Sequence, residues 1–177
     1  MSRESGASGR SILTSPAEMW RRVRSLPPAW WILAGITGFI GSVPLGLMMQ
    51  YGNPEPLIAL ALPMMYGLGG PNILLGWAIH QLHGIILAFM TIASLQVLRD
   101  PAYIETLRGA TAAAIVVGGI STLSLSMLLM PVWLGAVGYP FTPPVPDLAM
   151  PEKAWSIGGH ILYALPVTVG YALLARR

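Results

Sequence analysis

The sequence lacks cysteine altogether and is poor in charge: its 177 residues include seven acidic residues, ten basic residues and three histidines. The absence of cysteine excludes disulfides, thiolate metal sites and the covalent attachment of a c-type haem. Charged residues make up 10% of the chain and hydrophobic residues 54%, whereas a soluble domain usually carries about 25% charged residues. This balance indicates a protein that is solvated by lipid.

Four apolar runs are long enough to cross a bilayer, which takes about 20 residues of α-helix. They cover residues 30–50, 73–98, 109–137 and 154–175. Little chain remains outside them, so a second globular domain is excluded. The sequence predicts an all-α fold, a polytopic membrane protein built as a four-transmembrane-helix bundle over residues 29–177 and preceded by an N-terminal region, 1–28.

The basic residues lie almost entirely on one side of the predicted membrane. Nine of the ten precede the first span, follow the fourth, or lie between the second and third. Lys153 lies on the other side, with Glu55, Asp147 and Glu152. The positive-inside rule then predicts a plasma-membrane protein with both termini in the cytoplasm. The expected partners are the lipid bilayer and other membrane subunits or a second copy of the chain, and not nucleic acid.

Two short segments accompany the predicted spans. Ser15, Pro16 and Glu18 form a capping box, and the Trp and Arg residues that follow predict a short helix in the cytoplasmic interface. The alternative is a basic flank that only sets the topology. Residues 57–66 are apolar but too short to span, which predicts an interfacial helical segment on the outer side. The proline-rich loop over residues 140–151 is expected to cap that side.

All three histidines fall within predicted spans, His80 and His83 in the second and His160 in the fourth. The second and fourth spans align without gaps over His80 and His160, and the first and third align more weakly. This pattern predicts two repeated helical hairpins. His80 and His160 would then face one another at similar depth, with His83 and Tyr163 one turn deeper.

An ionisable side chain inside a span is costly and usually faces the protein interior with a partner. A neutral imidazole binds haem iron or copper, so His80 and His160 are a candidate axial pair for a b-type haem, with His83 as an additional or alternative ligand. The glycines around His80 would leave room for a flat macrocycle. The candidate cofactor-binding residues are His80, His83, His160, Gly76, Gly84 and Tyr163.

Copper is the second candidate, because methionines gather near the outer ends of the spans and thioethers together with imidazoles suit Cu(I). The candidate metal ligands are His80, His83, His160, Met127 and Met130. The chain would then be a small cofactor-binding membrane protein, acting as a subunit of a larger membrane complex.

The alternative is a structural or accessory membrane protein without catalysis. Its histidines would form interhelical hydrogen bonds with hydroxyls of the third span, such as Ser121, Thr122, Ser124 and Ser126, and no cofactor would be bound. Proton or solute transport is a further alternative. Enzymatic chemistry is not indicated, because no span carries a carboxylate away from its ends to orient a histidine.

Two stretches carry a resemblance to a known group of proteins. They are Met-Pro-Val-Trp-Leu-Gly-Ala-Val-Gly-Tyr-Pro at 130–140 and Gly-His-Ile-Leu-Tyr at 159–163. With them, the region from about 30 to 175 resembles small four-span integral membrane proteins of haloarchaea. That family commonly has His-x-x-Tyr-Gly in the last span, where this chain has Ala164. The resemblance implies the fold and the topology, and it implies no activity.

Overall fold

The computed structural model describes residues 15–53, 55–97 and 101–176, and these residues form helices and connecting loops. The helices are α1 (Pro16–Arg24), α2 (Pro28–Tyr51), the π-helix η1 (Leu57–Ala61), α3 (Leu62–Met65), α4 (Ile73–Val97), α5 (Pro101–Ile104), α6 (Leu107–Ser121), the π-helix η2 (Thr122–Leu129), α7 (Met130–Ala136) and α8 (Glu152–Ala175). The first 14 residues of the predicted N-terminal region, and residue 98 of the second predicted span, lie outside the described residues.

Four helical stretches are long and apolar enough to cross a membrane: α2, α4, the continuous run Leu107–Ala136, and α8. The run Leu107–Ala136, called the third span below, consists of α6, η2 and α7. The spans pack as an all-α bundle, and their ends lie within two residues of the predicted ones. The predicted fold class is confirmed.

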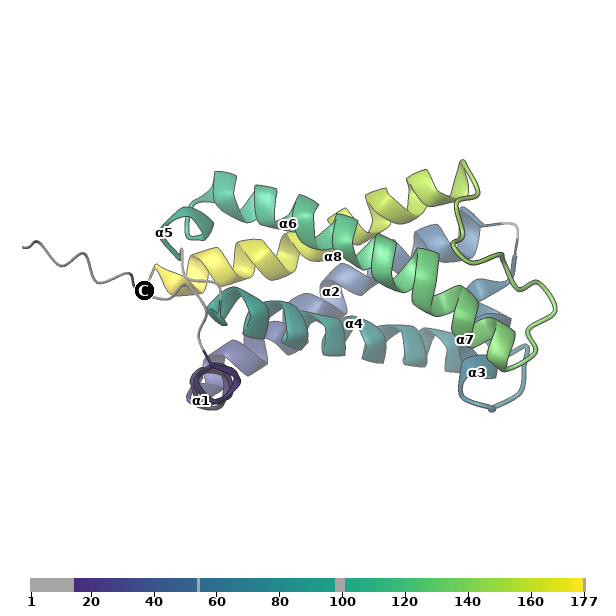
Figure 1. Ribbon diagram of the computed structural model, residues 1–177, viewed down its shortest axis with the longest axis horizontal. Helices are drawn as coiled ribbons and strands as arrows, with labels where there is room; N and C mark the ends of the chain where they lie inside the picture. The colour runs from purple at the N-terminus through teal and green to yellow at the C-terminus, as the bar shows by residue number, and fades with distance from the viewer. Residues whose placement is uncertain (1–14, 54, 98–100, 177) are drawn as a thin grey trace, which may run out of the picture.

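The packing of the spans is uneven (Figure 1). Helix α2 packs along both α4 and α8, and α8 also packs along α6, whereas α4 and α6 make no comparable contact. Helix α1 and the last turn of α8 lie at one end of the bundle, called the terminal end below. The opposite end, the loop end, carries η1, α3 and the loop of residues 137–151. The bundle is therefore open between α4 and the third span.

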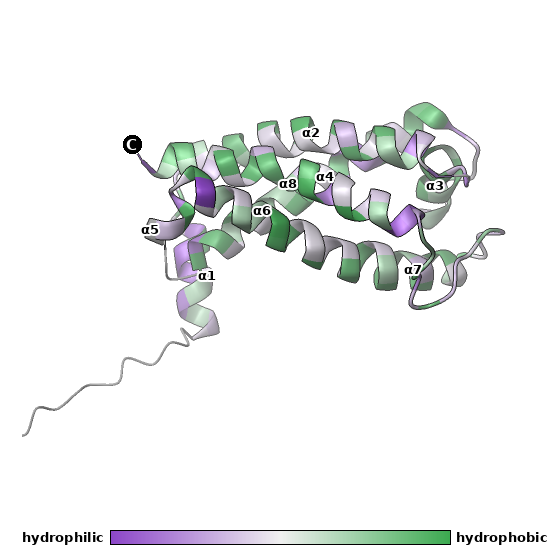
Figure 2. Cartoon of the chain, turned by 90° about the horizontal axis from the view of Figure 1, so that it is seen from above, coloured by the Kyte–Doolittle hydropathy of each residue, from purple (hydrophilic) through white to green (hydrophobic). Residues whose placement is uncertain are grey.

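The side chains are sorted by size between the inside and the outside of the bundle. On α2 the buried positions are mostly small, whereas large apolar side chains are exposed at helical spacing. The exposed ones include Ile32, Ile36, Phe39, Val43 and Leu47. Figure 2 shows apolar residues along the full length of the spans. Small residues at helix contacts and large apolar residues on the outside are typical of helices packed in lipid.

Glycines set the closest helix contacts. A Cβ on Gly41 of α2 would lie 2.4 Å from the carbonyl oxygen of Tyr163 on α8. A Cβ on Gly118 of α6 would lie 2.7 Å from the backbone nitrogen of Ile161 on α8. Both contacts involve backbone atoms, which cannot move aside as a flexible side chain can. The spacing of the helices therefore depends on these two positions.

The two hairpins, α2–α4 and α6–α8, share one offset of 80 residues in the sequence. Positions related by this offset are Ala34 and Ala114, Gly38 and Gly118, Ser42 and Thr122, and His80 and His160. Ala34 and Ala114 are both fully buried. These equivalences support the predicted repeat. A symmetric pair of hairpins would also need α4 to pack along α6 as α2 packs along α8, and that contact is missing.

The short segments form where they were predicted. The hydroxyl of Ser15 caps α1 by accepting from the backbone N–H of Glu18 at 3.3 Å. In Figure 1 α1 is viewed nearly end-on while the spans run across the view, so α1 lies crosswise to the bundle. The second segment, η1 and α3, packs on α4, where a Cβ on Gly76 would lie 1.7 Å from the carbonyl oxygen of Ile58. The position of both segments in a membrane interface stays a prediction.

Gly118 and its neighbour Gly119 offer a matched test of the packing. Gly118→Ala is expected to destabilise the protein by about 1–3 kcal/mol, because the added methyl group collides with the backbone of α8. Gly119→Ala should not destabilise it, because nothing lies within 4 Å of the added group. Unfolding of both variants in mixed micelles measures the difference, and equal stability of the two would contradict this packing of α6 on α8.

Candidate functional site

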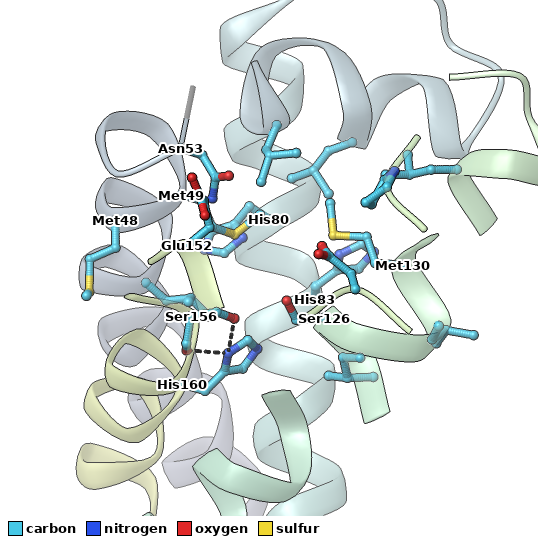
Figure 3. A pocket seen from close by; sticks show the side chains of 18 of the residues that line it. Met48, Met49, Asn53, His80, His83, Ser126, Met130, Glu152, Ser156 and His160 are labelled. Atoms are coloured by element: carbon cyan, nitrogen blue, oxygen red, sulfur yellow. Dashed lines mark hydrogen bonds between the residues drawn. The ribbon is translucent and has the colours of Figure 1, made fainter. Parts of the chain in front are cut away.

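A cavity of about 780 Å³ extends from the loop end into the bundle. Its walls come from α2, α4, the third span and α8, and residues of the 137–151 loop cover it at the loop end. The volume lies within the range of about 300–1,000 Å³ that is usual for small-molecule sites. All three histidines line the cavity, and Figure 3 shows them around one space. The cavity is therefore the candidate site.

The His80 ring is fixed by the backbone of α2. Its Nε2 lies 2.9 Å from the carbonyl oxygen of Ser42, and a carbonyl only accepts, so Nε2 carries the proton. The ring fits beside Gly46, whose Cβ would lie 2.8 Å from Cδ2 of His80. Trp77 meets the ring edge-on and is itself held by its Nε1–H, which donates to Gln50 at 2.7 Å. His80 is 5% exposed.

The His160 ring is fixed by its own helix and by the third span. Its Nδ1 lies 2.8 Å from the carbonyl oxygen of Ser156, one turn earlier on α8, so Nδ1 carries the proton. The same nitrogen lies 3.2 Å from Oγ1 of Thr122 on η2. Thr122 is one of the hydroxyl partners predicted for the structural alternative. Figure 3 shows the bonds from His160 to Ser156.

Each of these two rings keeps one nitrogen free. Nδ1 of His80 and Nε2 of His160 have no hydrogen-bond partner among the described residues. Neither atom is enclosed, because the Tyr139 hydroxyl is the only fully buried side-chain nitrogen or oxygen without a partner in the part of the chain that the structure describes. Both rings therefore present a lone pair to the cavity. Metal-binding histidines typically have this arrangement, one N–H held by a carbonyl and the other nitrogen free to ligate.

His83 is placed differently, one turn farther along α4 from the loop end than His80. Its Nε2 is hydrogen-bonded to the hydroxyl of Tyr66, which follows α3. Burial raises the pKa of Tyr66 above its usual range. Across the described ranges no group of three or more His, Asp or Glu side chains could hold a metal ion. The three histidines thus share the cavity without forming one cluster.

Of the two methionines predicted as metal ligands, one lines the cavity and the other does not. Met130 lines the cavity. The Met127 side chain is buried. The carbonyl oxygen of Met127 accepts a hydrogen bond from the backbone N–H of Asp147 at 2.9 Å. Met127 is not among the lining residues, so it anchors the loop from outside the cavity wall. Other methionines that line the cavity are Met48, Met49, Met65, Met90 and Met150.

Gly76, Gly84 and Tyr163 hold α4 in place. The space beside Gly76 is filled by Ile58, and a Cβ on Gly84 would lie 2.5 Å from the Cβ of Ser42. The buried hydroxyl of Tyr163 donates to the carbonyl oxygen of Gly84 at 2.7 Å and so joins α8 to α4. These contacts favour helix packing as the role of the two glycines. Gly84 and Tyr163 also line the cavity, whereas Gly76 does not.

The loop end of the cavity, called the mouth below, is acidic. Asp147 and Lys153 are each 7% exposed and form an ion pair, and the Lys153 ammonium also donates to Oγ of Ser126 at 3.3 Å. Glu55 and Glu152 line the mouth with no ion pair among the described residues. Because Lys153 is neutralised by Asp147, the two glutamates leave the mouth with negative charge. No periodic pattern in the sequence predicts this ion pair, because it joins the 137–151 loop to the start of α8.

Comparisons of the chain with known protein families, with curated proteins and with solved structures find no match. The resemblance to haloarchaeal four-span proteins stays a prediction, and the function is argued from the site alone.

Tyr139, in the loop beside the mouth, offers a test of this geometry. Burial, together with the charge of Glu55, raises its pKa to about 12. Its folded pKa is thus above the unfolded value of about 10, so the fold is more stable with this phenol neutral than with it ionised. That difference is fully present below pH 10 and is lost as pH rises through about 12. Phenolate absorbance of the wild type minus Tyr139→Phe should show this late titration.

Tyr139→Phe should also raise the stability by about 1 kcal/mol, because it removes a buried hydroxyl that has no partner. The control is Tyr51→Phe, whose side chain is 77% exposed and which should change little. A Tyr139 that titrates like a free phenol, or a destabilised Tyr139→Phe, would contradict the packing of the loop over the mouth.

Proposed function

We propose that this chain is a small integral membrane protein that binds a cofactor in the cavity, with His80 and His160 as the ligands. One observation supports this proposal: two residues that line the same cavity, His80 on α4 and His160 on α8, each have one ring nitrogen without a hydrogen-bond partner. These nitrogens are Nδ1 of His80 and Nε2 of His160. Each ring is already oriented by a backbone carbonyl, so binding needs no rearrangement of its hydrogen bond.

The volume of the cavity favours a b-type haem over a bare ion. A metal ion with its ligands occupies little space, whereas about 780 Å³ lies between these helices. Imidazoles from two helices of a bundle are the usual axial ligands of a haem held inside a membrane or a helical core. His80 and His160 would hold the haem iron, and Tyr163 lines the same cavity.

The charge of the mouth favours copper as the second candidate. Glu55 and Glu152 repel the carboxylates of a haem and attract a cation. The lining methionines add thioethers to the imidazoles, and this ligand set suits Cu(I). Copper needs only part of the cavity.

The orientation follows from the charges. Among the described residues the terminal end carries Arg21, Arg22, Arg24, Arg108 and Arg176, and the loop end carries Lys153. By the positive-inside rule we infer that the terminal end faces the cytoplasm. The mouth of the cavity, with the 137–151 loop over it, then lies on the outer side of the plasma membrane.

Titration of the purified protein in nanodiscs with haem, and separately with Cu(I) under reducing conditions, tests the proposal. We expect saturable binding of one of the two, with a Soret band if it is haem. His80→Ala and His160→Ala should each lower the affinity by at least about tenfold, because loss of even an indirect contact to a metal site usually costs that much.

Ser94→Ala is the matched control, because Ser94 lies on α4 outside the cavity and its hydroxyl bonds to its own helix, at the Met90 carbonyl oxygen. It should bind like the wild type. Wild-type protein that binds neither ligand, or histidine variants that bind as well as Ser94→Ala, would overturn the proposal.

A structural role is the second candidate function, favoured by the contact between Thr122 and His160. A double-mutant cycle of Thr122→Val and His160→Ala measures the coupling of the two side chains in the free energy of unfolding. The cofactor proposal and the structural role both predict a coupling energy of about 0.6 kcal/mol and at most about 1.7 kcal/mol. They differ in ligand binding. On the cofactor view Thr122→Val keeps its affinity, because the Ser156 carbonyl still orients the ring. If no cofactor binds and only this coupling is found, the structural role is correct.

A further inference from the structure

The cavity extends past the histidines to the flank of the bundle. Ile86 and Met90 of α4 and Leu129 of η2 line the cavity, yet they are 46%, 61% and 49% exposed. Side chains that are both exposed and cavity-lining mark an opening, and this one lies where α4 and the third span fail to pack. We call it the lateral opening. In a membrane it faces the lipid.

The lateral opening and the mouth lie at different depths. His80 and Met90 are ten positions apart on α4, which corresponds to about 15 Å along a helix. Along α4 the cavity therefore runs from the loop end past the middle of the helix. Its deeper part is lined by Ile86, Leu87 and Met90, which are apolar.

The mouth combines aromatic rings with the two free carboxylates. The aromatic residues that line it are Tyr66, Trp133, Phe141 and Trp155. The rings of Tyr66 and Trp133 lie 5.6 Å apart between centroids, and the Trp133 indole is held by its Nε1–H, which donates to the Met65 carbonyl oxygen at 2.9 Å. Ring faces attract organic cations. Lys153, the basic residue that lines the cavity within the described ranges, is paired with Asp147.

We propose that the cavity binds a lipophilic cation, a quaternary ammonium or phosphonium with an aryl or alkyl body. The cation enters from the bilayer through the lateral opening, passes Ile86 and Met90, and binds with its charge near Glu55 and Glu152 and its apolar body against the aromatic rings of the mouth. An anion of the same size is rejected, because its charge would meet the same carboxylates. This inference goes beyond the proposed function and does not require either imidazole to coordinate anything.

Tetraphenylphosphonium and tetraphenylborate are a matched pair of probes, similar in shape and opposite in charge. Equilibrium dialysis against the full chain in phosphatidylcholine nanodiscs, with empty nanodiscs subtracted, measures specific binding. We expect saturable binding of about one phosphonium per chain and none of the borate. Binding equal to that of empty nanodiscs, which is the result expected if lipid fills the cavity, overturns the proposal, as does equal binding of the borate.

Two changes test the mouth. Glu55→Gln and Glu152→Gln should each weaken phosphonium binding by about tenfold, because each removes a charge near the cation without changing shape. Ser94→Ala, outside the cavity, should leave phosphonium binding unchanged. The cofactor proposal is tested with haem and Cu(I) and this one with the phosphonium, so a failure of either can be told apart from a failure of the other. Unchanged affinity in both glutamine variants would contradict the assigned position of the charge.

Two neighbouring leucines of η2 test the lateral opening. Leu129→Trp should slow phosphonium binding severalfold because it narrows the lateral opening, whereas Leu128→Trp should not, since Leu128 is 48% exposed but does not line the cavity. Ile86→Trp and Leu82→Trp repeat the comparison on α4, where Leu82 is 55% exposed and also lies outside the cavity. Equal rates of binding within both pairs would place the entry elsewhere.

Discussion

Hydrogen bonds from two imidazoles to backbone carbonyls are the constraint on which the site depends. Inside a bilayer a ring N–H without a partner is costly, since no water can satisfy it. His80 meets this need at the Ser42 carbonyl across the α2–α4 hairpin, and His160 meets it at the Ser156 carbonyl on its own helix. Each ring is thereby fixed in one tautomer, and its second nitrogen is left facing the cavity. These two hydrogen bonds therefore determine which nitrogen of each ring is available to bind a ligand.

The cavity exists because the two hairpins are packed unequally. Small residues let α2 approach α8 closely, as at Gly41 against the Tyr163 backbone. The equivalent approach of α4 to α6 does not occur, although the offset of 80 residues relates the two hairpins. The space left between α4 and the third span is lined by side chains of both, and the 137–151 loop closes only its loop end. The missing contact between α4 and the third span therefore accounts for both the cavity and the lateral opening.

The positions of the four spans could be predicted from the sequence, because the hydropathy of about 20 consecutive residues does not depend on how the helices pack. It also predicted that the histidines would face inward, and that Thr122 was available to one of them. It could not identify Ser42 as the partner of His80, because any carbonyl is available to a nearby ring and only the packing selects one. Gly76 shows the same limit, since a glycine that leaves space and a glycine that lets Ile58 approach look identical in sequence.

The two tautomers are the most direct test of this account, and the three histidines make their spectrum simple. Nitrogen NMR of histidine-labelled protein at neutral or higher pH, assigned with single-histidine variants, distinguishes a protonated Nδ1 from a protonated Nε2. We expect Nε2–H for His80 and Nδ1–H for His160, and we expect the resonance of the unprotonated nitrogen of each ring to shift when ligand is added. Opposite tautomers, or unprotonated nitrogens whose shifts show a hydrogen bond already in place, would contradict this account.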